Sequence, residues 1–135
     1  MFYATIHITN LIYNDIVIYL CLQRTEVENI ITLSKAFSDI NRLKIVALIL
    51  REKELCVCEI CDTLNLSQPL VSRHLKQLKD ANILESYQSG KWIIYTITPK
   101  PTPLSKAYFN ELQLNFTTLP KLITCTRITH DHKKS

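Results

Sequence analysis

The chain has 135 residues, 47% of them hydrophobic, and a formal net charge of +4. This length fits one domain with a modest core, and a single glycine with five prolines excludes a turn-rich all-β sandwich and favours helices. The longest apolar run, residues 16–22, is too short to cross a membrane, and no Lys or Arg precedes Arg24 as a secretory signal would require. We therefore expect a cytoplasmic protein without a membrane segment.

Positive charge is concentrated in the second half of the chain. Residues 26–65 hold five Lys or Arg against seven Asp or Glu, whereas residues 66–100 and 101–135 each hold five against two. This distribution is typical of a protein that binds nucleic acid through one part of its surface.

Residues 1–25 are predicted to be an extension outside the main domain, and we assign them no function. Ile6 and Ile8 alternate with polar residues in a short strand-like pattern, and the apolar residues that follow have no clear period. Three interpretations stay open: the extension pairs in a dimer, lies loosely on the surface, or is a translated leader.

From residue 26 the apolar spacing becomes helical. One face of a first helix is marked by Val27, Ile30, Ile31, Ser34 and Phe37. A second helix, capped by Ser38 or Asp39, is predicted to turn inward Ile40, Leu43, Val46, Ala47 and Leu50. The polar run 51–54 is then expected to be a solvated link.

The remaining elements follow the order of a winged helix-turn-helix. A third helix runs from the cysteine-rich stretch to about residue 64, a tight turn covers 65–67, and a fourth helix reaches about residue 81. Two strands, 83–87 and 92–97, flank the only glycine, Gly90. A last helix covers 104–116, before a basic tail at 117–135. We therefore predict a mainly α fold with a small β-hairpin, whose DNA-binding domain covers 26–116.

The fourth helix has one apolar side and one polar side. Val71, Leu75 and Leu78 face the core, and His74 lies at the boundary. The polar side suits DNA, because Gln and Arg match base edges while Ser and Lys suit phosphates. A merely solvated basic face is the alternative. The predicted DNA contacts, with one at the hairpin tip, are Gln68, Pro69, Ser72, Arg73, His74, Lys76, Lys79 and Lys91.

Three of the five cysteines lie within six residues, at Cys56, Cys58 and Cys61. They are too close in sequence to staple distant loops, so we expect reduced thiols that bind a ligand. Cys56 and Glu59 match the capping-box spacing, which places Cys56 just outside the third helix. All three thiols can then converge only if the first turn unwinds.

Three thiolates suit a soft, thiophilic ion, whereas a closed structural zinc site needs a fourth ligand that the nearby sequence lacks. Incidental buried cysteines are the alternative. Cys21 and Cys125 are isolated and carry no predicted role. His130 and His132 in the tail are expected to be solvated.

Three segments resemble the arsenic-responsive repressors of the ArsR/SmtB family: ELCVCEIC at 54–61, SQPLVSRHL at 67–75 and GKWIIY at 90–95. The resemblance implies a homodimer on double-stranded operator DNA, with no cofactor and no enzymatic activity. It implies that As(III) or Sb(III) binds Cys56, Cys58 and Cys61 and releases the DNA. The implied dimer contacts come from helices near 27–37 and 104–116.

The chain departs from this pattern in its wing, where Tyr87 and Thr96 stand in place of the arginines of close relatives. Two other sensors stay possible: a cadmium- or lead-responsive repressor that uses Cys21 with Cys56 and Cys58, or a thiol redox-sensing repressor. A thiol redox enzyme using residues 58–61 would require a βαβ context that the sequence lacks. A zinc-stabilised interaction module would unfold with chelator, unlike a sensor.

Overall fold

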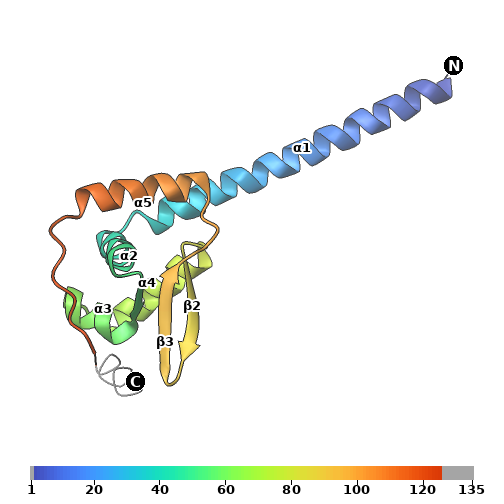
Figure 1. Cartoon of the computed structure of the whole chain (residues 1–135). Helices are drawn as coiled ribbons and strands as arrows, with labels where there is room; N and C mark the ends of the chain where they lie inside the picture. The colour runs from blue at the N-terminus through green and yellow to red at the C-terminus, as the bar shows by residue number, and fades with distance from the viewer. Residues whose placement is uncertain (1, 126–135) are drawn as a thin grey trace. The chain divides into compact units, whose positions relative to one another are not determined.

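The computed structural model describes residues 2–125, and for 2–12 and 22–24 it describes the backbone only. Its elements, labelled in Figure 1, are α1 (Phe2–Ala36), α2 (Ile40–Glu52), β1 (Glu54–Cys56), α3 (Val57–Leu64), α4 (Gln68–Asp80), β2 (Leu84–Ser89), β3 (Trp92–Ile97) and α5 (Pro103–Asn115). The chain divides between Thr32 and Leu33, and the second unit contains every element after α1. This order confirms the predicted winged helix-turn-helix, with one strand added.

The first helix starts far earlier than predicted. Residues 2–36 form one continuous α-helix, so the strand-like interpretation of Ile6 and Ile8 was wrong. Alternation over so few residues is a weak signal, and a helix satisfies its backbone hydrogen bonds without a partner strand. Val27, Ile30 and Ile31 are 54%, 52% and 47% exposed in the single chain. Within the described residues, no helix has the length and hydropathy needed to cross a membrane.

Asp39, one of the two residues predicted as a cap, starts α2. Its backbone is extended and its side chain accepts hydrogen bonds from the backbone N–H groups of Asn41 and Arg42, at 2.9 and 3.1 Å. These bonds satisfy two of the N–H groups that a helix start leaves unpaired. Ile40 was expected to face inward but is 56% exposed, because it lies at the end of the helix, beyond the packed neighbours that cover Ile45–Ile49.

Within the second unit, Arg42 on α2 connects the last turn of α1 with α4. Its Nε donates to the Ala36 carbonyl at 2.6 Å and one terminal nitrogen donates to the Lys35 carbonyl at 2.9 Å. The other terminal nitrogen donates to Gln77 Oε1 on α4 at 2.8 Å. One guanidinium therefore covers the carbonyl end of α1 and fixes α2 to α4.

The structure contains a short strand that the sequence did not predict. Residues 51–54 were expected to be a solvated link, but α2 extends to Glu52 and β1 begins at Glu54. β1 pairs antiparallel with β3, with Cys56 opposite Ile94, and the strand order is β1-β3-β2. A three-residue strand is too short to show a periodic pattern in the sequence. Its formation depends instead on pairing with β3. At the other side of β3 the predicted hairpin is confirmed, with Gly90 at φ 58°.

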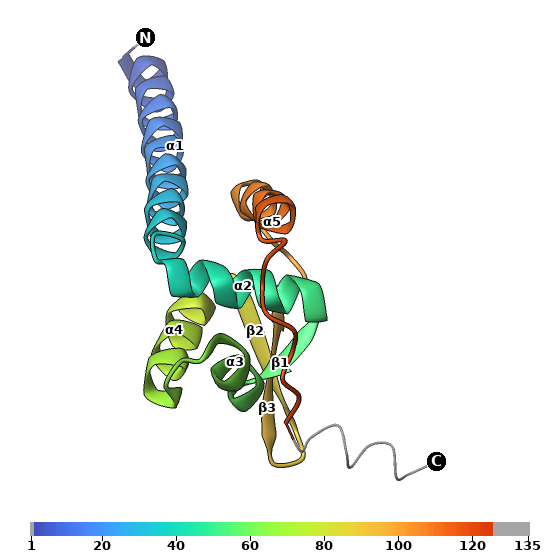
Figure 2. The same cartoon turned by 90° about the vertical axis from the view of Figure 1, so that its left-hand side faces the viewer.

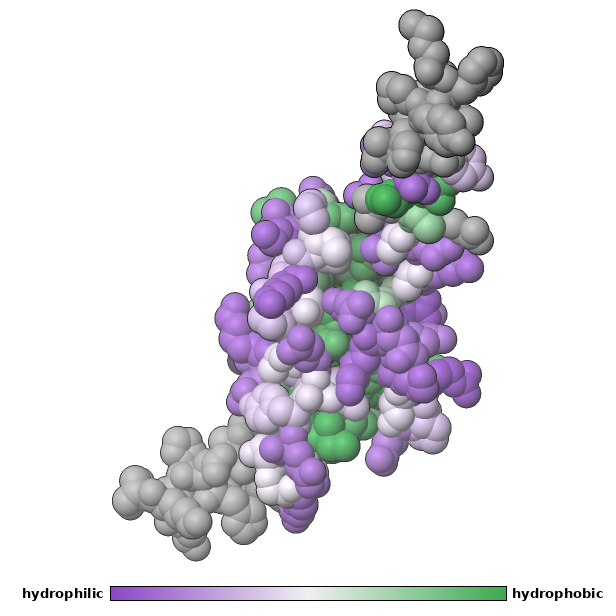
Figure 3. Space-filling model, turned by 90° about the vertical axis from the view of Figure 1, so that its right-hand side faces the viewer, coloured by the Kyte–Doolittle hydropathy of each residue, from purple (hydrophilic) through white to green (hydrophobic). Residues whose placement is uncertain are grey.

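The core lies around α2, which Figures 1 and 2 show between α5 and the α3–α4 pair. α5 docks through aromatic contacts, since Phe37 stacks on Tyr108 with ring centroids 4.2 Å apart and meets Phe109 edge-on. The largest fully buried side chains include Ile45, Leu48, Ile49, Leu55, Ile60, Leu75, Leu78, Ile83, Leu84 and Ile94. On the face drawn in Figure 3, hydrophilic residues cover most of the described surface. The buried side chains of this core pack α3, α4 and the hairpin together.

Asp39→Ala should lower the free energy of unfolding by about 0.5–2 kcal/mol, the usual effect of losing a helix N-cap. Asp39→Asn keeps a capping oxygen and should retain most of that stability near neutral pH. Urea unfolding measures both, and equal midpoints for wild type and Asp39→Ala would contradict the assigned cap.

The same cap predicts an acid dependence. Burial would raise the pKa of Asp39, but hydrogen bonds from the Arg42 and Asn41 N–H groups and the charges of His74 and Arg42 outweigh it and lower that pKa below its ordinary 3.8. The carboxylate's contribution is therefore present above about pH 3.8 and is lost as pH falls through the lowered folded value. Over that range Asp39→Asn should lose less stability than wild type.

Candidate functional site

Cys56 lies at the junction of a strand and a helix. It is the last residue of β1 and the N-cap of α3, with an extended backbone at φ −92° and ψ 167°. The buried Glu59 carboxylate accepts a hydrogen bond from the Cys56 N–H at 2.9 Å, which is the capping-box contact predicted from the spacing. Cys56 is therefore held outside the helix while Cys58 is held inside it.

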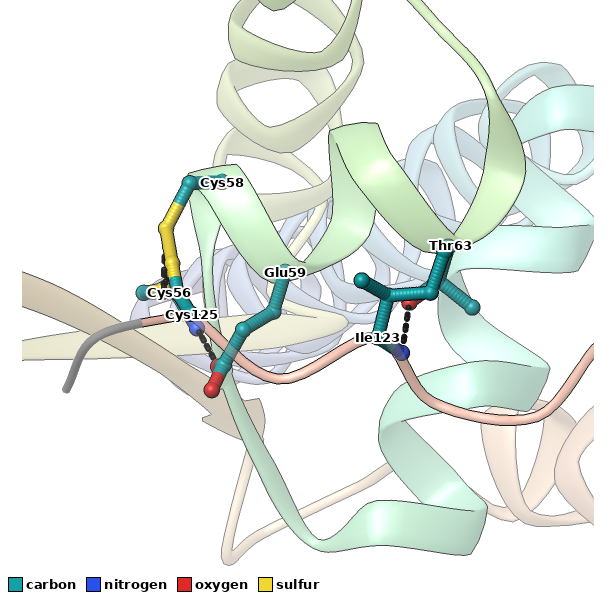
Figure 4. The surroundings of a disulfide bond; sticks show 6 residues. All are labelled: Cys56, Cys58, Glu59, Thr63, Ile123 and Cys125. Carbon is teal, nitrogen blue, oxygen red and sulfur yellow. Dashed lines mark hydrogen bonds between the residues drawn. A yellow bond between two sulfur atoms is a disulfide. The ribbon is translucent and has the colours of Figure 1, made fainter. Parts of the chain in front are cut away.

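This junction brings three sulfur atoms together, as Figure 4 shows. Cys56 Sγ lies 3.0 Å from Cys58 Sγ and 3.8 Å from Cys125 Sγ, and the three sulfurs all lie within 4.8 Å of one another. Cys58 and Cys125 are joined by a disulfide. The prediction of a free thiol was therefore wrong for Cys58.

Cys125 was missed because the sequence holds no local signal for it. It stands alone in the sequence, 67 residues after Cys58, and only the path of the chain after α5 brings it to α3. His130 and His132, predicted to be solvated, lie outside the described residues. Cys21 is exposed on α1.

Cys61 is placed differently from the other two cysteines of its motif. Its side chain is half-buried against the core and is not in the three-sulfur group. Its backbone carbonyl accepts from the N–H groups of Asn65 and Leu66, which closes the end of α3. Burial raises the pKa of the Cys61 thiol, and the neighbouring Asp62 charge raises it further. In this conformation Cys61 therefore belongs to the turn into α4.

The segment after α5, residues 116–125, crosses the C-terminal end of α2 and reaches α3 (Figures 1 and 2). Arg51 donates to the carbonyls of Leu119 and Pro120 at 3.2 and 2.7 Å. Further on, the Ile123 N–H donates to Thr63 Oγ1 on α3 at 2.9 Å (Figure 4). These contacts at two separate points position Cys125.

The helix α4 follows the predicted pattern on both sides. Val71, Leu75 and Leu78 are fully buried. Asn65 adopts the left-handed conformation at φ 52°, and Ser67 occupies the N-cap, although its side chain makes no capping hydrogen bond. The exposed side chains of the other face are Gln68, Pro69, Ser72, Arg73, Lys76 and Lys79.

Three of the predicted DNA contacts on α4 lie close to other side chains of the chain. His74 is only 5% exposed, and its Nε2 lies 3.9 Å from the Asp39 carboxylate, beneath the exposed face. Lys76 pairs with Asp80 at 2.7 Å, and Lys79 donates to Ser86 Oγ at 2.7 Å. The two lysines remain exposed and their flexible stems can reorient, whereas His74 is fixed by packing.

The wing has a tyrosine where close relatives are expected to carry arginine. Tyr87 donates a hydrogen bond to Glu54 Oε2 at 2.6 Å, which ties β2 to β1 across the sheet. Thr96 lies on β3, opposite both Glu54 and Glu85. Lys91 at the hairpin tip lies over the Trp92 ring, 5.1 Å from its centroid. The wing is therefore braced internally and presents one lysine at its tip.

Comparison with known proteins agrees with this geometry. Residues 39–86, from the α2 cap into the wing, match the model of the arsR family of bacterial regulatory proteins. The chain belongs to this family. The model of this family describes bacterial regulatory proteins. A solved winged helix-turn-helix domain from Mycobacterium bovis has a TM-score of 0.57 to this chain, which supports the fold assignment.

Curated relatives and solved structures extend the similarity. The arsenic resistance transcriptional regulator ArsR1 of Pseudomonas putida is 47% identical over 66 residues, covering 49% of this chain and 52% of that protein. The cadmium resistance transcriptional regulatory protein CadC of Listeria innocua is 43% identical over 63 residues, covering 47% and 53%. The chain thus spans about half the length of these relatives. Reduced HlyU from Vibrio cholerae has a TM-score of 0.60 and 25% identity, over 70% of this chain and 96% of that one.

Glu59→Ala should destabilise the protein by about 1–3 kcal/mol, because a buried N–H loses a hydrogen-bond acceptor. Glu59→Gln, which keeps an acceptor oxygen, should have a smaller effect. Urea unfolding of the reduced proteins tests this comparison. If Glu59→Ala unfolds at the wild-type midpoint, the Glu59 contact does not stabilise the junction.

Proposed function

We propose that the protein is a metalloid-responsive repressor. It binds double-stranded operator DNA as a homodimer when free of ligand, and it releases the DNA when trivalent arsenic or antimony binds its cysteines. The observation that carries this proposal is the contact of the Cys56 and Cys58 sulfurs, 3.0 Å apart at the start of α3. Closely placed thiolates favour soft ions over Mg²⁺ or Ca²⁺, and the similarity to an arsenic resistance regulator supports arsenic.

Cys56 and Cys58 are the shared pair of ligands in this proposal. Two thiols are candidates for the third position: Cys61, from the family resemblance, and Cys125, from its position beside the pair. No cofactor is needed, since the ion is the effector and not a resident group.

The DNA-binding surface is the exposed face of α4 with the hairpin tip. Gln68 and Arg73 can read base edges, while Ser72, Lys76 and Lys79 suit phosphates or either edge. Pro69 lies next to this face, and Lys91 reaches the backbone beside the groove. His74 is not among the contacts proposed here, because it is buried beneath this face with its Nε2 3.9 Å from the Asp39 carboxylate.

Dimerisation would place two copies of α4 in successive major grooves, about 34–36 Å apart. The proposed contacts come from residues 27–37 and 104–116. Both segments present large apolar side chains to solvent in the single chain, including Val27, Ile30 and Ile31 on α1 and Leu114, 72% exposed, on α5. Apolar faces of this kind favour burial against a second copy.

The cysteine junction touches the DNA-binding elements by two routes. Only residues 65–67 separate α3 from α4, and the Cys61 carbonyl holds that turn. Cys56 also pairs with Ile94 in β3, which is a strand of the wing. An ion that displaces Cys56 or the first turn of α3 would therefore shift α4 and the wing together. Switches of this kind have coupling free energies of about 1–3 kcal/mol.

A Cys56→Ser/Cys58→Ser variant should bind operator DNA but should not release it with arsenite. The serine hydroxyls keep the size of the side chains but do not provide thiolates. Fluorescence anisotropy of labelled operator DNA, in the presence of a phosphine reductant, measures release. Cys21→Ser is the matched control and should respond as wild type. If arsenite still releases the double variant, the junction is not the sensor.

Arg73→Ala should weaken specific operator binding by about 1–3 kcal/mol, the range for a bidentate base contact. Lys121→Ala removes an exposed charge from the segment after α5, outside the proposed DNA and dimer contacts, and is the control for a general loss of positive charge. Binding is measured at several salt concentrations. Equal losses for the two variants would show that α4 does not read bases.

Two alternative functions are each favoured by a specific observation. The similarity to CadC and the exposed Cys21 favour a cadmium- or lead-responsive repressor using Cys21 with Cys56 and Cys58. The Cys58–Cys125 disulfide favours a thiol redox-sensing repressor. Titration of the protein–operator complex with each ion, and with a hydroperoxide, separates these from arsenic sensing.

A further inference from the structure

We infer that Cys125 is a ligand of the soft-ion site, completing a three-thiolate set with Cys56 and Cys58. This inference rests on the proposed function and names the third ligand of its site. The site then joins three separate parts of the chain: the end of β1, the first turn of α3, and the segment that follows α5.

The sulfur positions suit one ion with little rearrangement. Sulfurs bound at about 2.3 Å from a common metal centre lie at most about 4.6 Å apart. Cys56 Sγ is already 3.0 Å from Cys58 Sγ and 3.8 Å from Cys125 Sγ. Cys58 and Cys125 have Cα atoms 6.5 Å apart, so reduction of their disulfide leaves two thiols on the same side of α3. Small rotations of these side chains then open a place for the ion.

The position of Cys125 beside α3 is fixed by contacts of the segment that contains it. Arg51 holds the carbonyls of Leu119 and Pro120, and Thr63 Oγ1 accepts from the Ile123 N–H only two residues before Cys125. Thr63 is itself buried. Leu119 and Leu122 also pack against the core. None of these contacts involves a sulfur atom, so they remain when the disulfide is reduced.

Cys61 would require a larger change to enter the same site. Its sulfur is outside the three-sulfur group, and its carbonyl is bound into the turn before α4. Bringing Cys61 to Cys56 requires the first turn of α3 to unwind and the hydrogen bond from the Cys56 N–H to Glu59 to break. Cys125 requires only that its disulfide be reduced.

The chemistry balances without a change in oxidation state of arsenic. Reduction of the Cys58–Cys125 disulfide takes two electrons and two protons. Two thiol molecules supply both and become a disulfide, whereas a phosphine supplies the electrons, takes the oxygen of one water molecule to become a phosphine oxide, and leaves the two protons of that water on the sulfurs. Arsenous acid then condenses with the three thiols, so that three As–S bonds replace three As–O bonds and three water molecules leave. The disulfide form has lost two of the three ligands, so the oxidised protein should not bind arsenite at this site.

The test is arsenite binding by the full-length protein reduced with a phosphine, since a dithiol reductant would itself chelate arsenic. Binding is followed by sulfur-to-arsenic absorption in the ultraviolet, and the cysteines protected from alkylation are identified by mass spectrometry. Cys125→Ser should weaken binding at least about tenfold, since even outer partners of a metal site change affinity by about 10–100-fold. In the wild type, Cys125 should be protected from alkylation together with Cys56 and Cys58.

The outcomes separate this inference from the proposed function. If wild type binds arsenite and Cys125→Ser binds it equally well, Cys125 is not a ligand, while the proposed function stands. If Cys61 is protected and Cys125 is alkylated, the assignment is also overturned. If wild type binds no arsenite, both fall.

A second variant tests the segment without removing a thiol. Thr63→Val keeps the shape of the side chain but removes the acceptor for the Ile123 N–H, so arsenite binding should weaken. Thr117→Val makes the same change at an exposed position of the segment and should have no effect. Urea unfolding of both variants confirms that they fold. Wild-type affinity in a folded Thr63→Val protein would overturn the role of this anchor.

Discussion

The backbone of Cys56 is the constraint on which the cysteine site depends. In a continuous helix the side chains of residues 56 and 58 would point about 160° apart. Cys56 instead ends β1 in an extended conformation, and pairing with β3 on one side and the Glu59 cap on the other keep it there. The two sulfurs then meet at the first turn of α3. A strand of only three residues therefore decides the geometry of the site.

The same junction explains how a ligand event can reach DNA. α3 continues through a three-residue turn into α4, while β1 continues through β3 into the wing. Tyr87 strengthens the second route, because its hydroxyl bonds to Glu54 at the start of β1. With Tyr87 and Thr96 in place of two arginines, the wing has a hydrogen bond within the sheet but fewer basic side chains for phosphate contacts. The exposed face of α4 is then the main source of DNA affinity in the proposed mechanism.

The segment after α5 adds a part that a helix-turn-helix core does not require. Its hydrogen bonds to Arg51 on α2 and to Thr63 on α3 position Cys125 at the start of α3. The disulfide and a bound soft ion would compete for the same sulfur atoms. Redox state and metalloid binding are then linked at one place, because oxidation removes the ligands that the ion needs.

The sequence by itself determined the order of the helices and the hairpin, a cap of α2 at Ser38 or Asp39, the cap of α3 at Cys56, and the two sides of α4. These features rest on contacts between residues close in sequence, where periodicity and capping chemistry are local. Only the tertiary structure decided β1, the burial of His74 and the place of Cys125. Each depends on partners distant in the chain: β3 for β1, Asp39 for His74, and α3 for Cys125. The length of α1 was missed for another reason. The apolar residues in its first part have no clear helical period, so the periodicity on which the prediction relied gave no sign of a helix there. The motif at 56–61 thus pointed to the correct junction, but the third sulfur beside it comes from 67 residues away.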